Sequence, residues 1–153
     1  MKTRTKPIGP SRIMLQAERA ADLMTCSPLS IRADADIAEA VAFLTDKGFS
    51  AAPVIDEAGR PVGVLSRADL LVHNREQDAT KADLASVGDI MTPAVYCVPP
   101  DAPADRVVKD LVDLKVHRLF VVDPDGILIG VISAVDVLRR LSPERTDDEH
   151  RAF

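Results

Sequence analysis

The stretch GVLSRADLL, residues 63–71, occurs a second time with small changes as GVISAVDVL, residues 130–138. Each copy gives a glycine, two apolar residues, a serine and an aspartate three residues after the serine. The glycine and the apolar residues predict the end of a strand, and the serine predicts the start of a helix. Two copies of one strand-to-helix junction indicate an internal repeat.

The repeat extends well beyond this junction. The offset of 67 residues that places Met24 on Met91 also places DLMT (22–25) on DIMT (89–92) without a gap. The same offset aligns further pairs: Asp34 with Asp101, Val41 with Val108, Leu44 with Leu111, Asp56 with Asp123, Gly59 with Gly126, Gly63 with Gly130, Ser66 with Ser133 and Asp69 with Asp136. The chain is therefore a tandem duplication.

Each copy predicts the order strand, helix, strand, strand, helix. The expected strands are 29–31, 52–55 and 61–65 in the first copy and 96–98, 119–122 and 127–132 in the second. The first helix of each copy is expected to begin after a capping aspartate, Asp34 or Asp101, and Gly48 is placed to end it in the first copy. Because a unit of about fifty residues buries little core alone, the copies should pack together around a pseudo-two-fold axis.

Composition and charge limit the possible functions. The 153 residues are 46% hydrophobic and carry a net charge of −5, which argues against a general nucleic-acid surface or anionic-membrane surface. The basic start MKTRTK is followed by PIGPSR and not by an apolar signal core, and no run approaches the ~18 apolar residues of a membrane span. We therefore expect a soluble protein of the cytoplasm.

The sequence offers little for catalysis or metal binding. Cys26 and Cys97 have no partner at metal-ligand spacing, so both are expected to be reduced structural thiols. The histidines His73, His117 and His150 share no metal spacing either, and no nucleophile with a base stands out. We expect no enzyme and no metal.

The doubled D-apolar-M-T segment, the apolar strand that ends in aspartate and the G-apolar-apolar-S-x-x-D junction resemble a pair of cystathionine-beta-synthase (CBS) domains, a Bateman module. The resemblance covers about residues 20–141. It implies an α+β fold of two β-α-β-β-α repeats around a pseudo-two-fold axis. The expected divisions are an N-terminal tail (1–19), repeat 1 (20–72), a linker (73–86), repeat 2 (87–141) and a C-terminal tail (142–153).

The resemblance also implies a function. CBS pairs are regulatory modules that bind adenosine-containing ligands (AMP, ADP, ATP, and in some members NAD or S-adenosylmethionine) in clefts between the repeats, and they usually form dimers. No further cofactor is implied. Because the tails are too short to fold alone, we expect any regulated target to be a separate, unidentified protein. The alternative is a module that dimerises or docks on a partner without a ligand.

The repeated junction supports two interpretations. In the family, the serines Ser66 and Ser133 and the acids Asp69 and Asp136 would contact the ribose and phosphate of the ligand, and the glycine before them would let the ligand approach the strand. Ser-x-x-Asp is also a capping box, in which the serine and the acid satisfy the helix N-terminus. Both interpretations stay open at this point.

The pair His117 and Arg118 precedes a strand in the second copy only, since the offset aligns it with Ser50 and Ala51. By resemblance, this pair points into the central cleft and binds phosphate, and a guanidinium can hold phosphate in a bidentate manner. The alternative is an exposed arginine paired with a nearby acid. Arg67, in the first turn of a helix, is a weaker candidate.

The adenine ring requires apolar walls and backbone groups that contact its edge. By resemblance, eight residues are expected to surround it: Ser30, Ile31, Ala52, Pro53, Cys97, Val98, Leu119 and Phe120. The alternative role for these residues is ordinary core packing.

Overall fold

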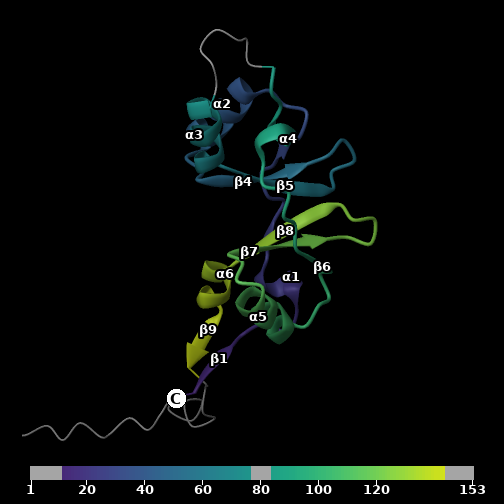
Figure 1. Cartoon of the computed structure of the whole chain (residues 1–153). Coiled ribbons are helices and arrows are strands. Elements are labelled where there is room, and N and C mark those ends of the chain that lie inside the picture. Colours follow the sequence, from purple (N-terminus) through teal and green to yellow (C-terminus); the bar gives the residue numbers. More distant parts are fainter. Residues whose placement is uncertain (1–11, 77–83, 144–153) are drawn as a thin grey trace, which may run out of the picture.

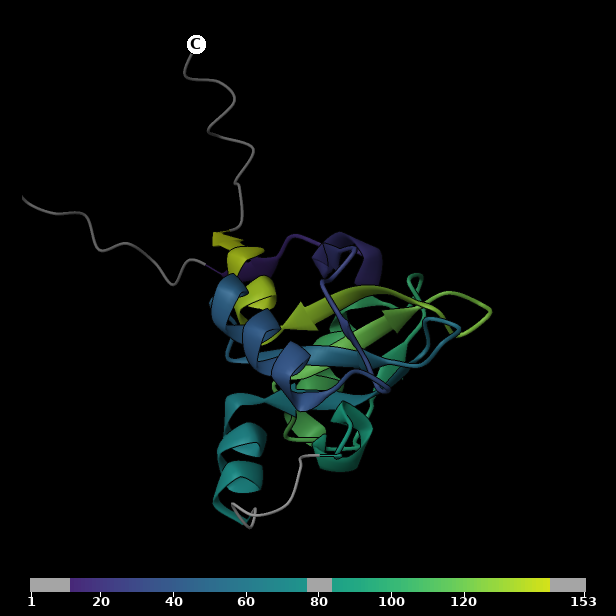
Figure 2. The same cartoon turned by 90° about the horizontal axis from the view of Figure 1, so that it is seen from above.

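The computed structural model describes residues 12–76 and 84–143. It consists of two halves stacked end to end, with the sheets facing each other in the middle and most of the helices at the outer ends (Figure 1). Seen from above, the two central hairpins lie one over the other (Figure 2). The α+β class and the division into two similar repeats are confirmed.

The first repeat has a three-stranded sheet covered by helices. Strand β3 (Ile31–Arg32) runs parallel to β4 (Ala51–Ile55), which pairs in antiparallel fashion with β5 (Pro61–Ser66). Helix α2 (Ile37–Lys47) lies between β3 and β4, and α3 (Arg67–Glu76) follows β5. The predicted strand-helix-strand-strand-helix order is therefore present.

The second repeat has the same order of elements. Strand β6 (Cys97–Val98) is parallel to β7 (Arg118–Val122), and β7 is antiparallel to β8 (Leu128–Ser133). Helix α5 (Ala104–Asp113) precedes β7, and α6 (Ala134–Arg139) follows β8. In both repeats the apolar side chains of the strands and helices form a separate core.

Two predicted helix caps were wrong. The N-cap of α2 is Asp36, whose Oδ1 accepts a hydrogen bond from the Glu39 N–H at 2.7 Å, whereas Asp34 accepts one from Arg32. Helix α5 follows Pro103, which offers no side-chain cap, so Asp101 is not a cap either. Both helices begin later than predicted, because the chain turns first after β3 and β6.

The opening segment of each copy, residues 20–25 in the first and 87–92 in the second, packs against the other copy. Helix α1 (Ala20–Leu23) belongs to the first copy but packs into the core of the second, beside α5 and β8. Helix α4 (Val87–Ile90) belongs to the second copy but packs into the core of the first, beside β5 and α3. The repeats thus exchange their first helices.

Backbone pairing fixes this exchange. The Ala20 N–H donates to the Ala102 carbonyl at 2.8 Å, and the Val87 N–H donates to the Ala35 carbonyl at 2.9 Å. After α1, strand β2 (Thr25–Cys26) pairs with β8, and Thr92 bridges to Val64 in the corresponding way. Because the 67-residue offset relates these contacts to one another, they establish the predicted pseudo-two-fold axis.

The glycines of the repeated junction serve this exchange. A Cβ atom at Gly63 would lie 2.6 Å from the Met91 sulfur, and one at Gly130 would lie 2.5 Å from the Met24 sulfur. Each methionine comes from the opening segment of the other copy. The space that a side chain would occupy at each of these glycines is therefore filled by a methionine of the other copy.

The aspartates of the opening segments cap their own short helices. Asp22 accepts from the Glu18 and Arg19 N–H groups at 3.1 Å, and Asp89 accepts from the Ser86 N–H at 2.8 Å. These hydrogen bonds favour the ionised form and lower the pKa of Asp22 and of Asp89. Their stabilising contribution is therefore present at neutral pH and is lost as the pH falls below the ordinary aspartate pKa.

The ends of the described chain pair with each other. Strand β1 (Ile13–Leu15) is antiparallel to β9 (Leu141–Pro143), so the expected tails contribute an ordered two-stranded sheet. Helix α3 continues to Glu76, past residue 72, where the first repeat was expected to end. The rest of the expected tails and linker, residues 1–11, 77–83 and 144–153, lies outside the described residues. None of the helices in the described part has the length and apolar character needed to span a membrane.

Candidate functional site

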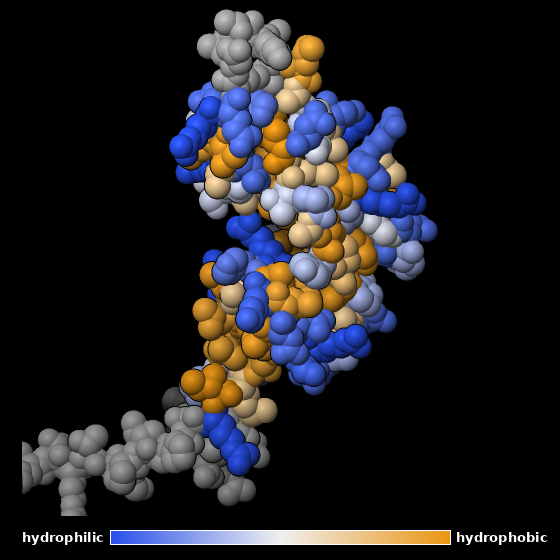
Figure 3. All heavy atoms as spheres, in the orientation of Figure 1, coloured by the Kyte–Doolittle hydropathy of each residue, from blue (hydrophilic) through white to orange (hydrophobic). Residues whose placement is uncertain are grey.

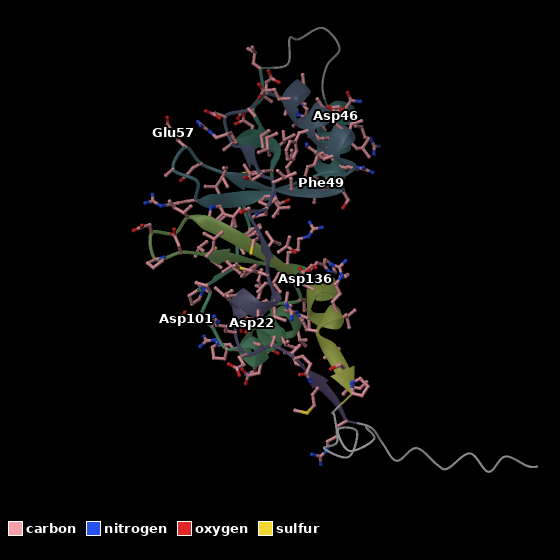
Figure 4. All side chains as sticks on the ribbon, turned by 180° about the vertical axis from the view of Figure 1, so that it is seen from behind. Asp22, Asp46, Phe49, Glu57, Asp101 and Asp136 are labelled. Atoms are coloured by element: carbon pink, nitrogen blue, oxygen red, sulfur yellow. The ribbon has the colours of Figure 1, made fainter. Side chains whose placement is uncertain are left out.

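Two cavities open where the repeats meet. The first, about 310 Å³, is lined by Asp136 and is called here the Asp136 cleft. The second, about 340 Å³, is lined by Asp69 and is called the Asp69 cleft. Figure 3 shows a hollow between the two halves on the side of α3 and α6, and Figure 4 shows Phe49 and Asp136, which both line the Asp136 cleft, on opposite sides of the gap.

Each cleft draws on both repeats. The Asp136 cleft combines residues 25–29 and the β4 region of the first copy with the β8–α6 junction of the second. The Asp69 cleft combines residues 92–96 and the start of β7 with the β5–α3 junction of the first copy. The 67-residue offset relates the two sets, so the clefts are pseudo-symmetric versions of one site.

The β8–α6 junction forms the polar end of the Asp136 cleft. One oxygen of Asp136, Oδ2, accepts from the Ser133 N–H at 2.8 Å and from the Ser133 hydroxyl at 2.9 Å. The Asp136 N–H in turn donates to the Ser133 hydroxyl at 3.2 Å, which completes a capping box. The other oxygen, Oδ1, is 3.4 Å from the Thr25 hydroxyl, a lining group of the same cleft.

The β5–α3 junction repeats this arrangement in the Asp69 cleft. The Oδ2 atom of Asp69 accepts from the Ser66 N–H at 2.9 Å, and the Asp69 N–H donates to the Ser66 hydroxyl at 3.1 Å. The cap is therefore present in both copies. The cap engages one oxygen of each carboxylate, so it does not by itself exclude a ligand contact at the other oxygen. The other oxygen of Asp136 also lies 3.8 Å from the guanidinium of Arg139.

Arg118 is shared by the two clefts. It is the first residue of β7, pairs in register with Ser133, and lines both cavities. In the part of the chain that the structure describes, no carboxylate lies within ion-pair distance of its guanidinium. The alternative of an arginine paired with a nearby acid therefore lacks a partner among residues 12–76 and 84–143.

The other predicted cations have different positions. His117 lines the Asp69 cleft but not the Asp136 cleft. Arg67 lines neither, and its Nε donates to the Phe49 carbonyl at 2.8 Å. Lys115, which was not predicted, lines the Asp69 cleft beside His117.

The eight residues expected around an adenine ring are not brought together. Pro53 lines the Asp136 cleft, and Phe120 lines both clefts. Their neighbours Ala52 and Leu119 are 1% exposed and belong to the two cores, because successive residues of a strand point to opposite faces. In β4 and in β7, therefore, one residue of each pair lines a cleft and its neighbour packs in a core.

The other four lie in separate cavities. Ser30 and Ile31 line one with Arg32 and Phe43, and Cys97 and Val98 line another with Asp101 and Asp123. The residues that precede them, Leu29 and Tyr96, line the two clefts instead.

Burial raises the pKa of the Cys97 thiol, which keeps it protonated at neutral pH. Among residues 12–76 and 84–143, no group of three or more His, Cys, Asp or Glu side chains is arranged to hold a metal ion.

Comparison with known proteins identifies the fold family. The family model for the CBS domain matches two segments of this chain, residues 20–75 and 87–143. The chain is 32% identical over 141 residues to the magnesium transporter MgtE of Thermus thermophilus, covering 89% of this chain and 30% of that protein. It is 34% identical over 113 residues to the gamma-3 subunit of the bovine (Bos taurus) 5′-AMP-activated protein kinase, covering 70% of this chain and 22% of that protein. The chain thus spans less than a third of the length of either relative.

Solved structures give the same result. The structure of CBSX2 in complex with AMP superposes with a TM-score of 0.67 at 29% identity, covering 80% of this chain and 95% of that chain. The CBS domain of a bacterial CNNM/CorC family Mg²⁺ transporter in complex with ATP has a TM-score of 0.70 at 27% identity, covering 82% and 88% of the two chains. The chain belongs to the CBS domain family and carries two CBS domains in tandem.

Proposed function

We propose that this chain is a regulatory module that binds adenosine-containing nucleotides in the Asp69 and Asp136 clefts and signals to a separate protein. The observation that carries the proposal is the set of groups that each cleft combines: an acid that caps a helix with one of its two oxygens, Arg118, which has no carboxylate partner among residues 12–76 and 84–143, and an apolar wall that includes Phe120. Ligand pockets typically have volumes of this order.

The acid, the arginine and the apolar residues of each cleft contact different parts of the nucleotide. The second oxygen of Asp136 or Asp69 accepts hydrogen bonds from the ribose hydroxyls, and Arg118 binds phosphate. Phe120 supplies an apolar wall for the base in both clefts. Pro53 and Leu29 extend this wall in the Asp136 cleft, and Tyr96 extends it in the Asp69 cleft. Two similar solved structures, CBSX2 with AMP and the CNNM/CorC domain with ATP, support an adenine nucleotide as the ligand.

The role is binding and not catalysis. The residues that line the two clefts include a capped acid and basic groups but no paired nucleophile and base. We propose the nucleotide as a regulatory ligand, with AMP, ADP and ATP first and NAD or S-adenosylmethionine as further candidates. The free thiols Cys26 and Cys97 fit a reducing compartment, so we propose the cytoplasm.

The direct test is a thermal-shift screen of the purified protein. A ligand that binds the native state raises the melting temperature, and the shift grows with its concentration. We expect AMP or ATP to raise it, with NAD and S-adenosylmethionine tested beside them. A protein that dimerises but responds to none of these compounds would instead be a ligand-independent interaction module.

Asp136→Asn is expected to lower the affinity for AMP about tenfold or more. The amide can still cap α6 through its oxygen, but the ribose loses a charged acceptor, and a hydrogen bond to a charged group is worth about 1.5 to 3 kcal/mol. The melting temperature of the ligand-free protein should change little. Calorimetry with AMP checks the affinity, and Asp69→Asn tests the other cleft in the same way. Unchanged affinity in Asp136→Asn would contradict the ribose role and leave Asp136 as a cap.

We also propose a homodimer of CBS pairs. The helices keep apolar side chains at the surface, including Val41 in α2, Val112 in α5, Leu71 in α3 and Leu138 in α6. Two-fold association is a common way to bury such faces. Light scattering is expected to give twice the mass of one chain at micromolar concentration, and a monomer at that concentration and above would contradict the proposal.

A further inference from the structure

Lys115 has a backbone conformation that suits glycine and not lysine. Its φ is 54°, in the left-handed region. The 67-residue offset aligns it with Gly48, which has a φ of 66° and ends helix α2. The two repeats thus keep the same left-handed turn after their first long helix, but the second fills it with a residue that this conformation disfavours. Such strain at a cleft points to a role outside folding.

Lys115 lines the Asp69 cleft together with His117 and Arg118. None of the three forms an ion pair with a carboxylate among residues 12–76 and 84–143. Asp69 is the only acid among the residues that line this cleft. The cleft therefore contains two permanent positive charges and a histidine against one negative charge.

The Asp136 cleft is different. Its charged lining residues are Arg118 and Asp136 alone, and Asp136 also lies 3.8 Å from the guanidinium of Arg139 in α6. The position that corresponds to Lys115 is Gly48, which has no side chain to contribute. Lys115 therefore adds one positive charge to the lining of the Asp69 cleft that the Asp136 cleft does not have at the corresponding position.

We propose that the Asp69 cleft is the polyphosphate site of the module and that Lys115 sets this preference by contacting phosphates beyond the first. The inference rests on the proposed nucleotide function and specifies the ligand class of one cleft, a nucleoside di- or triphosphate. An ammonium on a flexible stem can follow a phosphate chain as a point charge, whereas the guanidinium of Arg118 binds one phosphate with fixed geometry. A nucleoside monophosphate suits the Asp136 cleft.

Two substitutions separate this role from a structural one. Lys115→Gly restores the residue that the first repeat uses, and Lys115→Asn keeps a side chain that tolerates the left-handed conformation. Both remove the charge while relieving the strain. The melting temperature of the ligand-free protein is expected to hold or rise, while the affinity for ATP falls about tenfold and the affinity for AMP stays within about twofold.

Calorimetry with ATP and with AMP measures these affinities in the full chain. The control is Lys109→Asn, which removes one positive charge from α5 at a site outside both clefts, where Lys109 lies 3.9 Å from Asp113. It should leave both affinities unchanged. Equal losses for AMP and ATP in Lys115→Asn, or no loss for either, would overturn the role of Lys115 while leaving nucleotide binding intact. A wild-type protein that binds neither nucleotide would overturn the proposed function itself, and this inference with it.

Discussion

Replacing Arg118 by alanine is expected to weaken the binding of AMP and ATP at least thirtyfold and to leave adenosine within about twofold. Arg118 lines both clefts, so a single substitution removes the phosphate partner from each. A thirtyfold loss corresponds to about 2 kcal/mol, which lies within the range for hydrogen bonds to charged groups. Adenosine carries no phosphate, so its contacts with the acid and the apolar wall remain.

Calorimetry with the three ligands measures this effect. Arg118→Lys should give an intermediate loss, because an ammonium keeps the charge but cannot bind phosphate in a bidentate manner. Arg106→Ala is the matched control, since Arg106 is exposed on α5 near Asp110 and lines neither cleft. Equal losses for adenosine and AMP in Arg118→Ala would show that the substitution disturbs the cleft in general and would contradict the phosphate role.

Gly63→Ala is expected to destabilise the protein by about 2 to 3 kcal/mol, a cost typical of overpacking in a well-packed interior. The new Cβ would lie 2.6 Å from the Met91 sulfur and 2.7 Å from the Thr92 carbonyl oxygen. That carbonyl accepts a hydrogen bond from the Val64 N–H at 2.9 Å, so it cannot move away without breaking the bridge between the copies. The side chain of Met91 can adjust, but the backbone cannot.

Gly130→Ala provides the comparison. There the atoms nearest to the new Cβ all belong to the Met24 side chain, at 2.5 to 3.0 Å. Urea denaturation should therefore show that Met24→Ala recovers much of the stability lost in Gly130→Ala, whereas Met91→Ala recovers little in Gly63→Ala. If both double variants recover equally, or if Gly63→Ala is as stable as the wild type, the backbone contact at Thr92 is not the constraint.

The fold could be predicted to a large extent because it is repeated. The gapless offset of 67 residues, the two hairpins and the left-handed glycine at Gly48 all appear in the structure. The exchange of the opening segments could not be predicted in this way. A repeat pattern states which residues correspond, but it does not state whether Met24 packs within its own copy or on the other.

The candidate site could be predicted only in part. The serine-aspartate junctions, Arg118, Pro53 and Phe120 lie at the clefts. Ala52 and Leu119 do not, because strand alternation turns each away from its neighbour and into the core. Lys115 was missed because its significance lies in a backbone angle, which becomes apparent only when φ at Lys115 is compared with φ at Gly48.

The crossing of the opening segments also has a consequence for how the chain acquires its structure. Thr25 meets Asp136 across 111 residues of sequence, and α1 completes a core whose other members are synthesised last. As the chain leaves the ribosome, the first repeat lacks α4 and α1 lacks the core into which it packs. Such distant contacts make loop closure expensive and folding slow. We therefore expect neither repeat to be stable without the opening segment of the other, so that the two repeats acquire their native structure together after most of the chain has been made.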